Sequence, residues 1–489
     1  MILERQTANF TSDAKDYKWK ALATVAMGSI MGTMDASITN IAFPILTTIF
    51  RSDLTTVMWV ALAYILVCSS LMLVLGKISD LMGRKKIYAS GMFIFTIGLI
   101  ACSLAQSIGQ LILFRMFQAV GAAMIISCGP AIVIESFPPK EIGRGLGLLG
   151  SSVSIGFIAG PILGGFLLTW LDWRSIFYVR AAVGLITLFM AIALLKKDRV
   201  KEGKPRLDLK GIVTSSMGLF CIVFGVSQIR EAGLKSPLVY LLMGLGLLGL
   251  FVFILIELHA KDPIVDLSFF KNRVFSGAMC SLFLMFVGAP FYILIMPFYL
   301  IQALGLTPAK AGLLLTVTSM TTIVVGPISG TLSDRFGPAR FSTIGAGAIV
   351  VSSFFMLGFD LQTGVPAIIP VLVLLGVGIG TFNPPNNSII MGAVPRDRLG
   401  TASALIATLR QVGISLGMAF AGTIFSARRV IHQAKLIHRG LDTGDAANLS
   451  IPLAFHDALL ISIFLGSIVV MCTLFFGIRK TDHGPGHHH

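Results

Sequence analysis

Charged side chains are scarce in this sequence. They make up 12% of the 489 residues, whereas an ordinary soluble domain has about 25%. Hydrophobic residues account for 55% of the chain, and the mean hydropathy is +0.87. A water-soluble chain of this length could not bury so much apolar surface, so the composition excludes a soluble enzyme, a disordered protein and a nucleic-acid-binding protein.

Several chemical signatures are missing as well. The six cysteines lie inside apolar runs, without the spacing of a metal site or a disulfide framework, and we interpret them as small core residues. The sequence contains no phosphate-binding Walker loop, no metal-ligand cluster and no nucleophile–base arrangement. It therefore predicts no enzyme, no metal and no cofactor. Residues 1–20 have no cleavable signal core, and we expect the end of the tail, His483–His489, to be a purification-tag remnant.

Long apolar runs dominate the rest of the chain. A helix needs about 20 apolar residues to cross a bilayer, and in lipid only helices or closed barrels satisfy the backbone. The alternating segments of a membrane barrel do not occur, so the sequence predicts an all-α membrane protein. We expect fourteen spans, at about 21–49, 56–76, 87–106, 110–134, 144–169, 174–195, 210–229, 237–258, 273–302, 309–330, 341–360, 366–391, 401–427 and 455–478.

The basic residues predict the orientation of these spans. Most of the 38 lysines and arginines fall in segments on the same side as the N-terminus. Because basic segments remain inside, both termini are expected to be cytoplasmic. This bias explains the net charge of +15 without nucleic acid. The basic stretch Arg428–Arg439 is an exception, in an expected long outer loop where the rule is weak.

One sequence pattern occurs twice. Gly76-x-x-Ser-Asp80-x-x-Gly83 returns eight spans later as Gly330-x-x-Ser-Asp334-x-x-Gly337, in both cases on the inner side between two spans. Repeated halves are typical of secondary transporters, although tight inner turns alone could also use glycine and aspartate. The offset predicts six, two and six spans. The expected divisions are a cytoplasmic segment 1–20, a bundle 21–195, a basic loop with two extra helices 196–272, a bundle 273–480 and a tail with tag remnant 481–489.

Further motifs follow in order along the chain. The inner loop Gly76–Lys86, the stretch Leu111–Gln118, the glycine-rich Gly156–Gly165, the acidic Asp35–Pro44 and Arg410–Gly413 together resemble motifs of the major facilitator superfamily. More narrowly, they resemble its fourteen-span drug:proton antiporter branch, and the resemblance covers essentially the whole chain. The glutamate signature of the peptide-importing branch is absent from the first span.

The resemblance implies two pseudo-symmetric six-helix bundles plus two inserted helices. It also implies alternating access and a secondary antiporter that exports amphiphilic or hydrophobic compounds, driven by inward proton flow and by no cofactor. The expected partners are a small amphiphilic substrate, protons and the lipid bilayer. The expected setting is the cytoplasmic membrane of a prokaryote, with the protein as a monomer.

Asp35 is the acid that lies deepest inside a span. It stands about 14 residues into the first run, or about 21 Å from its inner end, and Arg115 reaches a similar depth from the outside. An ionisable residue inside a membrane is a functional hypothesis by default. Burial disfavours the ionised carboxylate and a nearby cation favours it, which suits a proton carrier. The alternatives are a fixed ion pair for Asp35 and snorkelling of Arg115 to the outer surface.

Arg180 departs from the family pattern. The family usually has asparagine at this position and proline where this chain has Ala182. With Arg115 and Arg410, three arginines within spans accompany one aspartate. If Arg180 faces the cavity rather than snorkelling, an anionic or zwitterionic substrate becomes more plausible than a lipophilic cation.

The remaining expected site residues fall into two sets. The proton-coupling pair is Asp35 and Arg115, and the substrate cavity is expected to include Asn40, Tyr64, Gln118, Arg180, Phe286, Tyr292, Asn383, Asn386 and Arg410. The aromatic members could alternatively form a lipid-facing belt. Conformational roles are expected for Gly76, Asp80, Gly83, Arg84, Gly156, Gly160, Pro161, Gly164, Gly165, Gly330, Asp334 and Gly337. For these residues, ordinary close packing and a solvated inner turn are the alternatives to a flexing contact and a latch between bundles.

Two other functions remain open at this point. The same fold could export or flip an anionic or zwitterionic amphiphile of the cell itself, such as a lysolipid or fatty acid. A non-transporting receptor or sensor on the same fold is the alternative of another class. That alternative predicts loss of the intramembrane acid, whereas Asp35 is present.

Overall fold

The computed structural model describes residues 2–138, 141–196, 209–232, 236–259, 267–394 and 399–478. In these ranges every regular element is a helix. Within the described ranges, thirteen helices are long and apolar enough to cross a membrane. The remaining expected span lies in α7, where the stretch Val213–Val226 forms a shorter apolar segment. The prediction of an all-α multi-pass membrane protein is confirmed.

The helices fall into two compact units. The first unit comprises residues 1–52 and 59–207, and the second comprises 53–58 and 208–489. The first unit is built from α1 (Ile2–Ile49), α2 (Leu54–Met82, whose first turn belongs to the second unit), α3 (Arg84–Ser103), α4 (Ile108–Ser136), α5 (Ile142–Trp170) and α6 (Ser175–Leu194). The helix α1 runs through the polar segment that precedes the first expected span.

The second unit contains the two extra helices and the second six-span set. Its elements are α7 (Leu209–Ala232), α8 (Pro237–His259), η1 (Leu267–Lys271), α9 (Arg273–Gly288), α10 (Pro290–Ile293), α11 (Met296–Phe298), η2 (Tyr299–Ala303), α12 (Pro308–Phe336), α13 (Pro338–Met356), α14 (Val365–Gly392), α15 (Leu399–His438) and α16 (Thr443–Ile478). The helices α7 and α8 pack against each other, and α7 also packs against α15.

The internal repeat is visible in the packing of each unit. In the first unit α3 packs against α4 and α6, while in the second α13 packs against α14 and α16. The helix α1 packs against α4, α5 and α6, as α9 does against α14, α15 and α16. The two signature loops also share their backbone, because Gly83 has φ 98° and ψ 130° and Gly337 has φ 95° and ψ 127°. A side chain would be strained at either position, which explains the repeated glycine.

Close approach between α1 and α5 fixes the helix that carries Asp35. A side chain added at Gly156 would lie 2.0 Å from the Thr33 hydroxyl, and one at Gly160 would lie 1.8 Å from the Ser37 hydroxyl. The Gly156–Gly165 motif therefore packs within the first bundle, where small residues let two backbones meet. Pro161 lies inside α5 at this contact.

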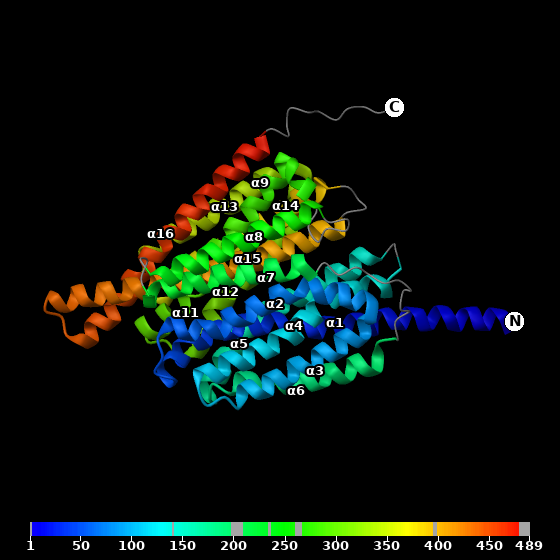
Figure 1. Cartoon of the computed structure of the whole chain (residues 1–489), viewed down its shortest axis with the longest axis horizontal. Helices are drawn as coiled ribbons and strands as arrows, with labels where there is room; N and C mark the ends of the chain where they lie inside the picture. The colour runs from blue at the N-terminus through cyan, green and yellow to red at the C-terminus, as the bar shows by residue number, and fades with distance from the viewer. Residues whose placement is uncertain are drawn as a thin grey trace. The chain divides into compact units, whose positions relative to one another are not determined.

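Two sequence-based expectations need correction. The expected outer loop between the last two spans is mostly helical, because α15 and α16 extend to a short turn around Gly440 and form the orange hairpin of Figure 1. The expected span 273–302 is not among them, because Arg273–Ala303 forms one segment long and apolar enough to cross a membrane. Pro290 and Pro297 divide its helix into α9, α10, α11 and a π-helical turn, since proline removes a helix hydrogen bond. Cys280 is exposed rather than a core residue.

Candidate functional site

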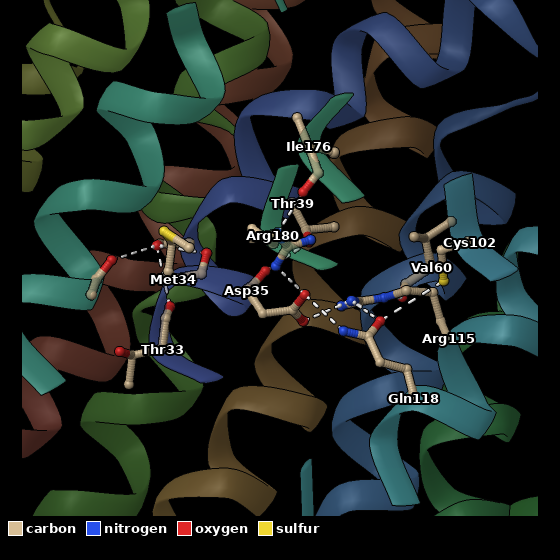
Figure 2. Close-up of polar contacts among 12 residues, drawn as sticks. Thr33, Met34, Asp35, Thr39, Val60, Cys102, Arg115, Gln118, Ile176 and Arg180 are labelled. Carbon is tan, nitrogen blue, oxygen red and sulfur yellow. Dashed lines mark hydrogen bonds and ion pairs between the residues drawn. The ribbon is translucent and has the colours of Figure 1, made fainter. Parts of the chain in front are cut away.

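Asp35 lies at the centre of a buried charge cluster in the first unit (Figure 2). The exposed fraction of its side chain is 0%, and those of Arg115 and Arg180 are 1% and 2%. The Arg115 Nη1 donates to Asp35 Oδ2 at 2.6 Å, and the Arg180 Nη1 donates to the other carboxylate oxygen. Neither arginine snorkels to the surface, so the helices α1, α4 and α6 meet at one carboxylate.

Gln118 and the backbone complete the shell around the carboxylate. Gln118 Nε2 donates to Asp35 Oδ1 at 3.1 Å, and its Oε1 accepts from Arg115 Nη1 at 2.8 Å. The Arg115 Nε donates to the carbonyl of Val60 at 3.1 Å. Gly98 on α3 provides room for this arrangement, because a side chain there would lie 2.6 Å from Gln118 Cβ. Arg115 is thus oriented by three acceptors from three helices.

Two polar atoms at the cluster have no partner among the described residues. The Arg180 Nε donates to the Ile176 carbonyl at 2.5 Å, but its Nη2 is buried without a hydrogen bond. The hydroxyl of Tyr64 is also buried and unpaired, while its ring lies 4.2 Å from the Arg115 guanidinium carbon. Buried polar groups are normally satisfied, so each unpaired group needs an explanation.

The cluster carries unequal charge. Two guanidinium groups face one carboxylate, so the buried group has a net charge of +1 when Asp35 is ionised. Buried charges are tolerated only when they are paired and hydrogen-bonded. The second arginine gives this cluster one more positive charge than its carboxylate can neutralise.

The other expected cavity residues do not join this cluster. Asn40 is partly buried on α1 and makes no described contact with the carboxylate. In the second unit the Arg410 guanidinium carbon lies 5.1 Å from the centre of the Phe286 ring, and its Nε is buried with no partner in the described part of the chain. Tyr292 is buried on α10.

The three asparagines of α14 make no described contact with Arg410. Asn386 Nδ2 donates to the carbonyl of Ala278 at 3.1 Å, which ties α14 to α9. The amide oxygens of Asn383, Asn386 and Asn387 are buried and unpaired among the described residues. The second unit therefore contains three buried acceptors, these amide oxygens, and one buried donor, Arg410 Nε, without a described hydrogen-bond partner.

The inner signature loop makes contacts within its own bundle. Arg84 Nη1 lies 2.8 Å from Glu135 Oε1 and donates to the Ala131 carbonyl at 3.1 Å. The side chains of Asp80 and Asp334 lie outside the described part of the structure. Gly76 and Gly330 sit at the first position of each motif, and their carbonyls accept from the Ser79 and Ser333 hydroxyls at 2.7 and 2.8 Å.

Sequence reasoning missed two acids in the second unit. Glu257 near the end of α8 is 4% exposed. Asp457 accepts from His432 Nε2 at 2.7 Å and pairs with Arg428 Nε at 3.2 Å, where α15 and α16 extend together. The position of Asp457 just inside the last predicted span was a usable signal, but its partners lay in a segment predicted to be a loop.

Several transporters and resistance proteins match most of this chain in sequence. The chain is 32% identical to the riboflavin transporter RibZ of Clostridioides difficile (strain 630), over 95% of this chain and 98% of the relative. It is 28% identical to the tetracenomycin C resistance and export protein of Streptomyces glaucescens, over 84% of this chain and 76% of the relative. It is 29% identical to the multidrug resistance protein Stp of Mycobacterium tuberculosis (strain CDC 1551 / Oshkosh), over 83% of this chain and 75% of the relative.

Solved structures and a family model agree with these relatives. The crystal structure of a bacterial homologue of the human lysosomal transporter Spinster has a TM-score of 0.69, at 13% identity, over 96% of this chain and 99% of the other. That likeness concerns the fold. The sequence model of the Major Facilitator Superfamily matches residues 25–418. With its helical units and internal repeat, the chain belongs to the major facilitator superfamily of transporters.

Proposed function

We propose that this transporter is a proton-coupled antiporter that exports amphiphilic or hydrophobic compounds by alternating access. The observation that carries the proposal is the fully buried Asp35, held by Arg115 and Arg180 from two other helices. An ionisable group in such a position is expensive unless it has a function.

Asp35 would act as the proton carrier. In its ionised form it accepts hydrogen bonds from both arginines, which hold α4 and α6 against α1. Protonation removes the negative charge and weakens both charge-assisted hydrogen bonds. The three helices can then rearrange, so proton uptake and a change of access are linked at one residue. Multidrug resistance and antibiotic export in the names of two relatives support this direction of transport.

The proposed setting follows from the charge distribution. Both termini would be cytoplasmic and the protein would lie in the cytoplasmic membrane of a prokaryote, where protons flow inward. It would act as a monomer and use the proton gradient alone, without a cofactor. The expected substrate is a small amphiphilic molecule that enters from the lipid or from the cytoplasm.

A second candidate substrate class is favoured by Arg180. Because this arginine points to Asp35 rather than to the surface, the site has excess positive charge. An anionic or zwitterionic amphiphile would fit this charge better than a lipophilic cation. The name of the relative from Clostridioides difficile adds riboflavin, a polar aromatic compound, to the substrates worth testing.

Transport by the purified protein in liposomes tests the proposal. A pH gradient is imposed, and the panel contains cationic, neutral and anionic amphiphiles together with riboflavin. We expect movement of at least one compound against its own gradient, and loss of that movement when a protonophore dissipates the pH gradient. Transport that is unaffected by the protonophore for every compound carried would refute proton coupling.

A further inference from the structure

We propose that the Asp35–Arg115–Arg180 cluster binds the anionic group of a substrate together with a proton. The anionic group, a carboxylate or a phosphate, would bind to the two arginines while the proton binds to Asp35. This inference rests on the proposed role of Asp35 as the proton carrier. It specifies how the second candidate substrate class binds and fixes the sign of the coupling for that class.

The charge of the cluster favours joint binding of an anion and a proton. With Asp35 ionised, the cluster has a net charge of +1, and protonation of Asp35 alone would raise it to +2. Two unneutralised guanidinium groups in a low-dielectric site repel each other strongly. An anionic group of charge −1 that arrives with the proton keeps the cluster at +1, so the doubly loaded state has the same charge as the empty one.

The cluster also holds hydrogen-bond donors that an anion could use. Arg180 Nη2 and the Tyr64 hydroxyl are buried, and neither has a hydrogen-bond partner in the described structure. Protonation of Asp35 would also weaken the hold on the Nη1 atoms of both arginines. Guanidinium groups bind carboxylates and phosphates through several donors at once, so the cluster holds the donors that an anion requires.

Five titratable side chains face Asp35 among the described residues. The charged neighbours are Arg115 on α4 and Arg180 on α6, and the uncharged titratable ones are Tyr64 and Cys68 on α2 and Cys102 on α3. The remaining neighbour of α1, helix α5, presents its glycine face. Asp35 is the carboxylate of this group, so it is the residue that would gain the proton when an anion binds.

The sign of coupling then follows from the charge of the substrate. An anion and a proton attract each other, so each raises the affinity of the site for the other. A cation and a proton repel each other and compete. Cationic compounds would therefore be exchanged for protons, whereas anionic compounds would travel in the direction of proton flow. Arg180, the departure from the family pattern, is the residue that makes the second mode possible.

Binding of matched probes in detergent, with no gradient, tests this proposal. The probes are 2-naphthoate, 2-naphthylmethanol and 2-naphthylmethylammonium, which share a ring and differ in charge. Isothermal titration calorimetry is run between about pH 5.5 and about pH 8. In this range the three probes, the arginines and the aspartates other than Asp35 keep their ordinary charge states. We expect the affinity for 2-naphthoate to rise as the pH falls, by up to about tenfold per pH unit. Calorimetry in buffers of different ionisation enthalpy should show proton uptake with this probe.

Variants separate the role of Arg180 from a general loss of charge. Arg180→Asn should weaken 2-naphthoate binding by at least about tenfold and leave 2-naphthylmethanol binding within about twofold, while Arg180→Lys should keep part of the affinity. Arg174→Asn is the matched control, since Arg174 lies in the same region of the chain and bonds to the Ala105 carbonyl. This control should bind all probes like the wild type.

Three results would overturn the inference. They are no binding of 2-naphthoate to the wild type, binding that weakens or stays constant as the pH falls, and equal losses in the Arg180 and Arg174 variants. Failure of the proposed export function would look different. In that case the rate of transport in liposomes would not depend on the pH gradient, and this outcome is independent of the binding assay.

Discussion

Replacement of Asp35 should destabilise the protein in a way that a second substitution partly reverses. Asp35→Asn leaves Arg115 and Arg180 buried without a carboxylate. Removing one partner of a buried ion pair costs about 3–5 kcal/mol. The two guanidinium groups then also repel each other, by about 3 kcal/mol for charges about 5 Å apart at an effective dielectric constant of about 20.

Arg180→Asn alone should have a small effect, because it leaves a neutral Asp35–Arg115 pair with its hydrogen bonds intact. In the Asp35→Asn background the same substitution removes the repulsion. The double variant should therefore be more stable than Asp35→Asn by about 3 kcal/mol. Such a coupling energy is what a double-mutant cycle measures for residues in direct contact.

The assay is the unfolding midpoint in detergent, followed by tryptophan fluorescence. We expect the order wild type and Arg180→Asn highest, the double variant next and Asp35→Asn lowest. Asp445→Asn, at an exposed acid in the first turn of α16, controls for the loss of one carboxylate and should change little. Additive effects of the Asp35 and Arg180 substitutions would refute the reasoning, because they would mean that the two side chains do not share a charge balance.

Three further predictions test other parts of the structure. Gly156→Ala should lower the unfolding midpoint, because the added methyl group overpacks the contact with α1 at a cost of about 1–3 kcal/mol. Gly150→Ala in the same helix meets nothing within 4 Å and should be neutral. Equal effects of the two substitutions would contradict the α1–α5 contact. Arg410→Gln removes a buried cation for which no carboxylate partner is described, so it should raise the midpoint while reducing transport, and a lower midpoint would contradict this. Arg84→Gln and Glu135→Gln should each cost no more than about 1 kcal/mol and should not be additive in a double-mutant cycle, because the two side chains pair with each other.

Much of the fold could be predicted because lipid imposes strong rules on sequence. Hydrophobic length placed the spans, and the repeated Gly76 and Gly330 motifs predicted two halves that the packing of each unit reproduces. The extended hairpin of α15 and α16 could not be predicted in the same way. Hydropathy locates apolar runs, and a helix that continues past the end of such a run, as α15 does to His438, leaves no signal in it.

The candidate site was predictable in part for a similar reason. Asp35, Arg115 and Arg180 were conspicuous as charges inside apolar runs, and their depth along each span suggested a contact between the first two. Depth alone does not give the rotation of a helix about its axis. The sequence therefore left open whether Arg180 snorkels or points inward, and the structure places it on the carboxylate. The pairing of Asp457 with His432 depended on a helix that the sequence did not predict.

Comparing exchange with gradient-driven transport in an Asp35 variant tests the proton-carrier role most directly. Wild type, Asp35→Asn, Asp35→Asn/Arg180→Asn and Asp445→Asn are reconstituted in liposomes, and the same compound is followed in both modes. We predict that both Asp35 variants retain exchange of labelled for unlabelled substrate without a gradient but lose accumulation driven by the pH gradient, whereas Asp445→Asn keeps both. Undiminished gradient-driven accumulation in either Asp35 variant would contradict the assignment of Asp35 as the proton carrier.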